Sequence, residues 1–288
     1  MNARAALVVA AVLAAGAAQA GEVETGLRME SEVLGRPLEF ALYRPDRATK
    51  GLPVVYLLHG RASDPGEWLR MGHVRATADR LIAAELIPPM LIVLPDGGSS
   101  WWVDTPAGNA GAVATAVSEE LPRAIERAYA TNPTRTGRAI AGNSMGGFGA
   151  LRLAFSHPGR YAAVASMSGA FWTRIKPGIR IDDDMAGRLQ RVFAGAFGTP
   201  FDVGRFLSQA PLTLAAAVPA KDRLPVYLTV SSGDRFRLAD EQDTVENALR
   251  AGGYAVVSRT TEGDHDWGTW EAALPDVLVF LGRYLEKR

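Results

Sequence analysis

The sequence predicts an α/β protein with a mainly parallel central sheet and helices on both of its faces. Two runs, Pro53–Leu58 and Met90–Leu94, are continuously apolar, which is typical of parallel strands buried on both faces. Helical stretches alternate with strand candidates along the chain. The segment Arg138–Ala150 has the composition of a short strand, a glycine-rich turn with a serine at its tip, and the start of a helix.

The same patterns predict the individual elements. Strands are expected at Leu38–Tyr43, Pro53–Leu58, Met90–Leu94, Arg138–Ala141, Ala162–Met167, Val226–Val230 and Ala255–Arg259. Helices are expected at His73–Glu85, Val113–Ala130, Met145–Ser156, Ala239–Ala251 and Thr269–Leu285. In such sheets ligands bind beyond the carboxyl ends of the strands, so the loops after the strands are where chemistry is expected.

The segment from about residue 171 to residue 219 breaks this rhythm, because it contains no clear core strand. It holds helical stretches at Met185–Phe197 and near Val203–Ser208, so we expect a helical insertion that caps the strand ends or forms a pocket wall. Three successive aspartates, Asp182, Asp183 and Asp184, suggest either a metal site or a solvated turn that caps the next helix. The capping turn is the favoured reading, and no metal is expected.

Residues 1–20 are interpreted as a secretory signal peptide. Arg4 precedes an apolar run, Ala5–Ala18, and Ala18-Gln19-Ala20 has the small-residue pattern of a cleavage site before Gly21. The alternative is an uncleaved membrane anchor, but the run is shorter than the roughly 20 apolar residues that a span needs. The expected product is a single catalytic domain, residues 21–288, located in a bacterial periplasm or secreted, with no further membrane span.

Charge and cysteine content exclude several classes of protein. The chain carries 31 basic and 31 acidic residues, so there is no basic surface that would indicate a nucleic-acid partner. It has no cysteine, which excludes disulfides, thiolate metal sites and a cysteine nucleophile. An exported protein without disulfides is compatible with a bacterial source.

The pattern Gly142-x-Ser144-x-Gly146 is that of a nucleophile elbow. The small flanking residues let a strand and a helix cross closely, while the serine hydroxyl stands clear of the backbone. The bland alternative is a glycine-rich turn without chemistry. The strand before it, the helix after it and the partners that follow favour Ser144 as a nucleophile.

Among the four histidines, His265 is the best base for Ser144, because it follows the last strand and precedes the last helix. His59 lies in a His-Gly pair typical of an oxyanion loop, His73 begins a helix, and His157 ends one. We expect structural roles for these three.

Asp234 is the expected orienting acid, since it follows the strand Val226–Val230 and lies between serine and histidine in the chain. Its alternative is an ordinary turn aspartate. Asp240 and Glu241 fall inside the next helix, and Asp264 and Asp266 flank the histidine too closely to hold the same ring. The order Ser144, Asp234, His265 is that of α/β-hydrolases.

The expected mechanism is acyl transfer to Ser144, with His265 as base and water releasing the acyl-enzyme. The oxyanion needs two backbone donors, and we expect the N–H groups of Met145, directly after the nucleophile, and Arg61, after His59-Gly60. This chemistry needs no cofactor.

Aromatic residues and one acid gather on the loops expected to rim the pocket. The predicted substrate contacts are Trp101, Trp102, Asp104, Phe171, Trp172 and Trp267. The alternative for each aromatic residue is that it only covers the end of the sheet.

Taken together, the motifs resemble those of the putative-esterase family of α/β-hydrolases, which includes esterase D, feruloyl esterases, siderophore esterases and mycolyltransferases. The matching residues are Leu57–Gly60, Trp68, Pro95–Gly98, Gly142–Gly147, Ser168-Gly169, Gly233-Asp234 and Gly263–Trp267. The chain departs from the family pattern at Arg61-Ala62-Ser63, where oxyanion loops are often glycine-rich, so the second donor is less secure than Met145.

The resemblance implies an α/β-hydrolase fold and a serine esterase. The predicted function is hydrolysis of small or aryl carboxylic esters. Two alternatives stay open: an acyltransferase with the same triad and an alcohol acceptor, and a non-catalytic binding protein on a hydrolase fold. A peptidase is disfavoured, because no gating domain is evident. The natural ester and the oligomeric state are not readable from the sequence.

Overall fold

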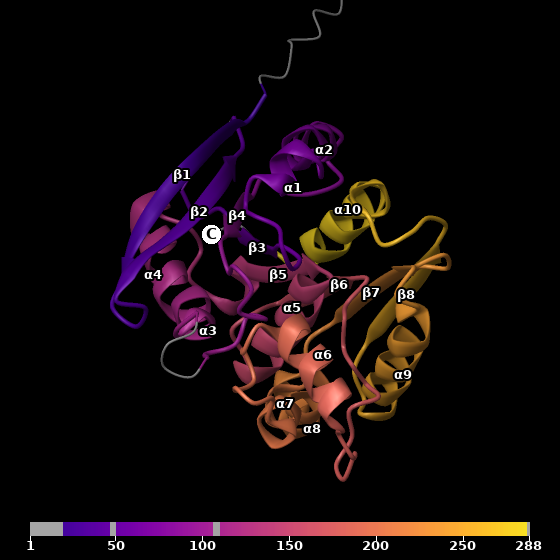
Figure 1. The fold of residues 1–288 in the computed structure, drawn as a ribbon. Helices are drawn as coiled ribbons and strands as arrows, with labels where there is room; N and C mark the ends of the chain where they lie inside the picture. The colour runs from indigo at the N-terminus through magenta and orange to yellow at the C-terminus, as the bar shows by residue number, and fades with distance from the viewer. Residues whose placement is uncertain (1–19, 47–49, 106–109, 287–288) are drawn as a thin grey trace, which may run out of the picture.

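The computed structural model describes residues 20–46, 50–105 and 110–286, and an eight-stranded sheet in the order β1-β2-β4-β3-β5-β6-β7-β8 runs through their centre (Figure 1). The strands are β1 Glu22–Ser31, β2 Arg36–Arg44, β3 Val54–Leu58, β4 Leu91–Pro95, β5 Arg138–Asn143, β6 Ala163–Met167, β7 Val226–Ser231 and β8 Val256–Thr261. The strands β4, β3, β5, β6, β7 and β8 are parallel, while β2 pairs antiparallel to both β1 and β4. This is the α/β-hydrolase fold that the sequence predicts.

The central strands are apolar throughout because both faces of the sheet are covered. In β3, Val54, Tyr56 and Leu58 belong to one hydrophobic core cluster, while Val55 and Leu57 belong to a second cluster on the opposite face. All five residues are fully buried. Period-two alternation therefore distributes one apolar run over two cores.

Helices cover both faces of the sheet (Figure 1). The helix bounds are α1 Glu67–Arg70, α2 Val74–Ala83, α3 Val113–Thr115, α4 Leu121–Tyr129, α5 Met145–Ser156, α6 Asp183–Phe193, α7 Val203–Gln209, α8 Pro211–Ala217, α9 Leu238–Ala251 and α10 Trp267–Gly282. The helices α2 and α10 pack on one face, and α4, α5 and α9 on the other. A π-helical turn, Ala116–Glu120, joins α3 to α4, so the expected helix Val113–Ala130 is one interrupted element.

The segment after β6 is the predicted helical insertion, and it carries α6, α7 and α8. Its core is aromatic: Phe193 lies 4.9 Å from Phe197 and 5.4 Å from Phe206, measured between ring centroids. Buried Arg152 of α5 ties the insertion down by donating to Gln209 Oε1 at 2.6 Å. Burial lowers the pKa of this guanidinium to about 10.

The three aspartates lie at the start of helix α6, where the predicted capping turn is formed. The Asp182 side chain accepts a hydrogen bond from Met185 N at 2.7 Å, and Asp183 and Asp184 lie in the first turn of the helix. Among residues 20–46, 50–105 and 110–286, no cluster of three or more His, Asp or Glu side chains could hold a metal ion.

Three elements, strand β1 and the short helices α1 and α8, differ from the expectations. Strand β1 was not predicted, because its residues at the sheet edge are mostly half-exposed and polar; it pairs only with β2. The short helix α1 was not predicted either. The predicted signal peptide lies almost wholly outside the described residues, and none of the described helices is long and apolar enough to cross a membrane.

We expect Gly146→Ala to destabilise the protein by on the order of 2 kcal/mol. A Cβ at Gly146 would lie 2.4 Å from Leu58 O and 2.7 Å from His59 O, both backbone atoms that cannot give way. Gly187→Ala is the matched control in helix α6, because its Cβ would meet only the far end of Arg191 at 3.5 Å. It should stabilise by roughly 0.5–1 kcal/mol through helix propensity. Urea unfolding measures both, and equal effects would contradict the packing argument.

Candidate active site

Ser144 lies at the turn between β5 and α5, with φ 54° and ψ −117°, a strained conformation for a residue with a side chain. A Cβ at Gly142 would lie 2.4 Å from Gly146 O, so strand and helix cross too closely for any larger residue there. Ser144 N donates to Met167 O of β6 at 2.8 Å, which fixes the turn against the neighbouring strand. The result is a hydroxyl raised above the carboxyl edge of the sheet.

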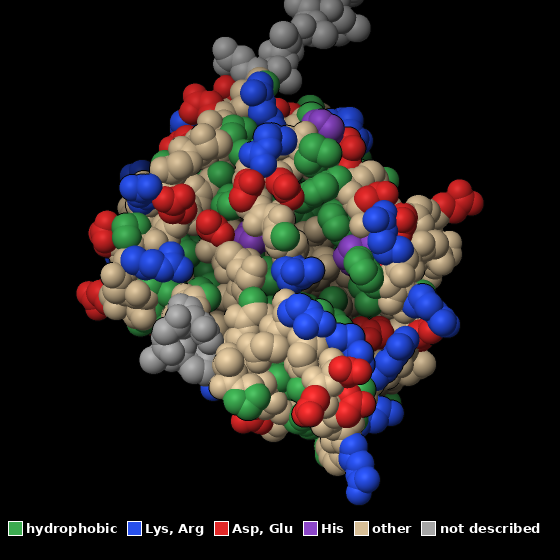
Figure 2. Space-filling model, in the orientation of Figure 1, with side chains coloured by type: hydrophobic (Ala, Val, Ile, Leu, Met, Phe, Trp, Pro, Cys, Tyr) green, Lys and Arg blue, Asp and Glu red, His purple; other side chains and the backbone are tan. Residues whose placement is uncertain are grey.

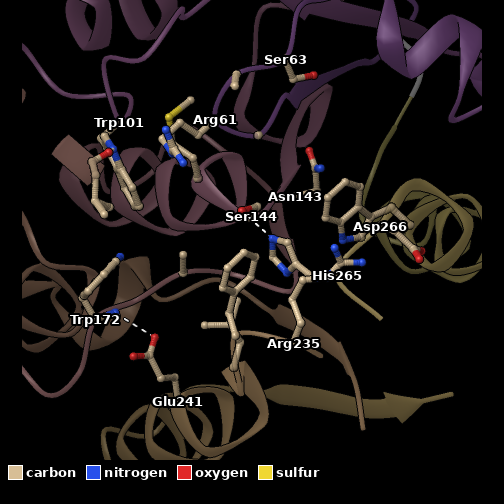
Figure 3. Close-up of a pocket in the computed structure, with 18 of the residues that line it drawn as sticks. Arg61, Ser63, Trp101, Asn143, Ser144, Trp172, Arg235, Glu241, His265 and Asp266 are labelled. Carbon is tan, nitrogen blue, oxygen red and sulfur yellow. Dashed lines mark hydrogen bonds between the residues drawn. The ribbon is translucent and has the colours of Figure 1, made fainter. Parts of the chain in front are cut away.

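His265 and Asp234 arrive at Ser144 from the loops after β8 and β7. His265 Nε2 lies 2.9 Å from Ser144 Oγ, and His265 Nδ1 lies 2.8 Å from Asp234 Oδ2 (Figure 3). The side chains of His265 and Asp234 are 8% and 1% exposed. An ionised carboxylate only accepts hydrogen bonds, so a proton on Nδ1 leaves Nε2 free to accept from the serine. The structure thus brings together the three residues that the sequence singled out.

Backbone contacts fix the orienting acid and its loop. Asp234 Oδ1 accepts from Phe236 N at 2.9 Å, so the second carboxylate oxygen is also held. Asp264 Oδ1 accepts from His265 N at 2.6 Å, and Asp264 Oδ2 pairs with Arg235 at 2.6 Å. These hydrogen bonds lower the pKa of Asp264 to about 2, and the one from Arg235 has the largest effect. Asp264 therefore ties the two loops together and does not touch the imidazole ring.

The remaining acidic rivals have other partners. Asp266 caps helix α10 by accepting from Thr269 N at 3.0 Å. Asp240 lies 3.4 Å from Arg237, and Glu241 accepts from Trp172 N at 2.8 Å. None of them contacts His265 Nδ1, which leaves Asp234 as the carboxylate on the ring.

The other histidines are placed in structural surroundings. His59 is fully buried; Gly97 N donates to its Nε2 at 3.0 Å, so its Nδ1 carries the proton and donates to Gly60 O at 2.7 Å. His157 Nδ1 lies 3.1 Å from Leu153 O at the end of α5, and exposed His73 pairs with Glu271.

The expected oxyanion donors flank Ser144 on two sides. Met145 is the first residue of α5, where backbone N–H groups have no partner within the helix. A Cβ built on Gly60 would lie 3.4 Å from Ser144 Cβ, so the loop that continues into Arg61 passes directly beside the nucleophile. Met145 and Arg61 both line the cavity at Ser144.

A cavity of about 750 Å³ opens over these residues, and a hollow is visible on this face of the molecule (Figure 2). Of the predicted substrate contacts, Trp101, Trp172 and Trp267 line it. Figure 3 shows Trp101 and Trp172 on one side of Ser144, and Asn143 and Asp266 on the other. The two sides are built from different elements, since Trp172 precedes the helices of the insertion and Trp267 begins α10.

Of the predicted substrate contacts, Trp102, Asp104 and Phe171 do not line the cavity. Trp102 is fully buried beneath it, where its Nε1 donates to His59 O at 3.3 Å. Asp104 accepts from Thr115 N and Thr115 Oγ1, and so fixes the start of the helical segment at α3. Phe171 is 4% exposed and packs under Gly169.

Sequence reasoning missed much of the cavity wall. The additional side chains that line it are Ala62, Ser63, Glu67, Asn143, Ala170, Arg174, Val192, Arg235, Phe236, Leu238, Glu241, Asp266 and Trp270. Asn143, Arg235 and Asp266 stand directly beside predicted catalytic residues in the sequence, so adjacency was an available signal. The rest come from loops and from helices α1, α6, α9 and α10, and which of their side chains face the cavity is visible only in three dimensions.

Glu241 is the buried acid of this wall, with an exposed fraction of 7%. Burial raises the pKa of its carboxyl above the ordinary value of 4.5, although the hydrogen bond from Trp172 N works in the opposite direction. Because the folded protein then holds this proton more tightly than the unfolded chain, Glu241 lowers the free energy of unfolding as the pH rises through 4.5.

We expect Glu241→Gln to remove this pH dependence. The free energy of unfolding of the wild type, relative to that of the variant, should fall as the pH rises from 4.5 toward neutrality. Glu246→Gln on the same helix is the control: hydrogen bonds from Ser258 and Arg250 outweigh burial there and lower the pKa. For Glu246 the relative stability should instead fall as the pH drops below 4.5 and stay level above it. Denaturant titrations at a series of pH values measure both, and parallel curves would contradict the assignment.

Comparison with known proteins gives consistent matches. The model of the family described as "Putative esterase" matches residues 31–281. "Esterase Rv1288" of Mycobacterium tuberculosis is 34% identical over 151 residues, which cover 49% of this chain and 31% of that protein. "Acetyl esterase" of Caldicellulosiruptor saccharolyticus is 22% identical over 244 residues, 84% of this chain and 87% of that protein.

Solved structures agree with these matches. A structure titled "ferulic acid esterase" superposes with a TM-score of 0.76 and 25% identity, covering 92% of this chain and 98% of its own. The chain spans about a third of the length of the first curated relatives that it matches, so those proteins contain much that has no counterpart here.

Proposed function

The chain belongs to the putative esterase family, and from that premise we propose that it is an exported serine carboxylesterase acting on small or aryl esters. The observation that carries the proposal is the single imidazole, His265, within hydrogen-bond distance of both Ser144 Oγ and Asp234 Oδ2. The curated esterases that the chain matches, and the structure titled ferulic acid esterase, support the same class of reaction.

In the proposed mechanism, His265 Nε2 takes the proton as Ser144 Oγ attacks the ester carbonyl carbon. Asp234 holds the ring with its proton on Nδ1 and stabilises the imidazolium that forms. The carbonyl oxygen becomes an oxyanion, which accepts hydrogen bonds from the N–H groups of Met145 and Arg61. The positive end of helix α5 stabilises its charge. His265 then protonates the leaving alcohol. In the second half of the reaction, His265 takes a proton from water as the water attacks the acyl-enzyme, and it returns that proton to Ser144 Oγ as the acid leaves.

We expect Ser144→Ala to lower kcat/KM for p-nitrophenyl acetate by at least about a thousandfold, as removal of a triad member does in other serine hydrolases. Ser63→Ala is the control, since it removes a hydroxyl of the same cavity that does not contact His265. It should retain most of this activity. A fluorophosphonate should label the wild type at Ser144. Equal rates for wild type and Ser144→Ala would refute the triad, and absence of labelling would favour a binding protein.

Export forms the second part of the proposal, and the surroundings of Gly21 support it. Gly21 N donates to Asp79 Oδ1 at 2.9 Å, and Tyr43 Oη donates to the same oxygen at 2.7 Å. The predicted cleavage after Ala20 would convert this nitrogen into an ammonium group beside a carboxylate whose side chain is 25% exposed. A charged donor strengthens that hydrogen bond.

We expect the protein recovered from a periplasm or culture medium to have the mass of residues 21–288. In that form, Asp79→Asn should cost about 1.5–3 kcal/mol of unfolding free energy, because the ammonium loses its carboxylate. The cost should be smaller in the chain that retains residues 1–20, where the nitrogen is a neutral amide. Mass spectrometry and denaturant unfolding measure these effects, and a mature terminus elsewhere would contradict this part.

A further inference from the structure

The direction in which His265 delivers its proton divides the cavity into two halves. The general acid must protonate the leaving oxygen, so the alcohol half of an ester lies on the His265 side of Ser144. From His265, ring contacts run to Trp270 at 5.1 Å and from there to Trp267 at 5.2 Å, measured between centroids. These tryptophans begin the wall that faces the leaving alcohol.

We call this side the alcohol wall, and it consists of Ser63, Glu67, Asn143, Asp266, Trp267 and Trp270. Its members are connected: Trp267 Nε1 donates to Glu67 Oε2 at 3.1 Å, and Ser63 Oγ donates to the same oxygen at 2.5 Å. In Figure 3, Asn143 and Asp266 lie on one side of Ser144, and Ser63 lies above them. Hydroxyl, amide, carboxylate and indole groups thus converge around one half of the cavity.

The opposite side, the acyl wall, consists of Trp101, Ala170, Trp172 and Val192. Trp101 Nε1 is already satisfied, because it donates to Val192 O at 3.2 Å. The rings of Trp101 and Trp172 both pack on Phe193 of α6, at 4.7 and 5.2 Å. Trp172 Nε1 is the one buried side-chain polar atom of this wall, within the described ranges, that lacks a hydrogen-bond partner. The acyl wall is therefore mainly hydrocarbon and aromatic, and the buried Glu241 carboxyl lies beside it, where it accepts from Trp172 N at 2.8 Å.

The alcohol wall carries buried polar atoms whose hydrogen bonds are not made. Asn143 is 1% exposed and lines the cavity, yet neither its Nδ2 nor its Oδ1 has a partner among the residues that the structure describes. Trp270 Nε1 is also buried and has no hydrogen-bond partner among the described residues. Each such buried atom costs free energy until a partner is bound. Two donors and an acceptor are best matched by hydroxyl groups, which both donate and accept.

We propose that the alcohol half of the substrate is a polyol, and that Asn143 binds a hydroxyl next to the ester oxygen, with Trp270 Nε1 as a second donor. This inference rests on the proposed esterase function and adds the chemistry of the leaving group. Trp267 and Trp270 supply apolar ring surface for the carbon skeleton, while Glu67 supplies further acceptor capacity. A site that hydrogen-bonds a hydroxyl discriminates against an ester that lacks it.

The test compares glyceryl 1-acetate with propyl acetate, which share one acyl group and differ by two hydroxyls on the alcohol. The ratio of their kcat/KM values is divided by the ratio of their hydroxide-catalysed rates, to remove intrinsic reactivity. We expect this normalised preference to be at least about tenfold in the wild type. Asn143→Leu should reduce it to within about threefold of unity, and Trp270→Phe, which keeps a ring but loses the N–H, should reduce it partly.

Val192→Ala on the acyl wall is the control, since it should change both esters by the same factor and keep the preference. Fluorophosphonate labelling of Ser144 shows whether each variant is folded, and Trp270→Phe replaces Asn143→Leu if the latter is not labelled. A wild-type preference near unity overturns the inference, because water would then satisfy Asn143. A preference that persists in Asn143→Leu overturns the role of Asn143. Failure of both labelling and hydrolysis in the wild type overturns the proposed function as well, and is distinguishable from the other outcomes.

Discussion

The close crossing of strand β5 and helix α5 is the constraint on which the site depends. Ser144 keeps a positive φ because hydrogen bonds hold its backbone on both sides. Its N–H donates to Met167 O, and its carbonyl oxygen accepts from Phe148 N and Ala170 N. The crossing leaves no room for side chains at Gly142 and Gly146. The nucleophile, the start of α5 and the loop at Gly60 are therefore positioned by one arrangement of backbone.

The reacting groups could be predicted from the sequence because they obey topology. Ser144, Asp234 and His265 each follow a strand of the parallel sheet, and the carboxyl ends of such strands meet at one edge. Strand and helix positions were equally accessible where apolar runs are long, as in β3, β4 and α5. Strand β1 was not, because an edge strand that pairs with one neighbour needs no apolar pattern.

Much of the cavity wall could not be predicted, because the direction in which a side chain points, rather than its residue type, decides whether it lines the cavity. Trp101 and Trp102 are adjacent, both have positive φ, and both are almost fully buried, yet only Trp101 lines the cavity. Trp102 instead turns beneath it to donate to His59 O. Asn143 and Glu241 were overlooked or set aside because their importance comes from burial, which a sequence does not display.

The buried Arg152 joins the insertion to helix α5 through Gln209, whereas the reacting groups lie in loops outside the insertion. Different segments of the chain therefore supply the acyl wall and the reacting groups. Of the acyl wall, Trp172 and Val192 come from the insertion at residues 171–219, and Trp101 and Ala170 come from loops that follow strands of the sheet. Substitutions in the insertion that keep its packing on α5 should therefore change selectivity for the acid half of an ester and leave the proton-transfer residues in place.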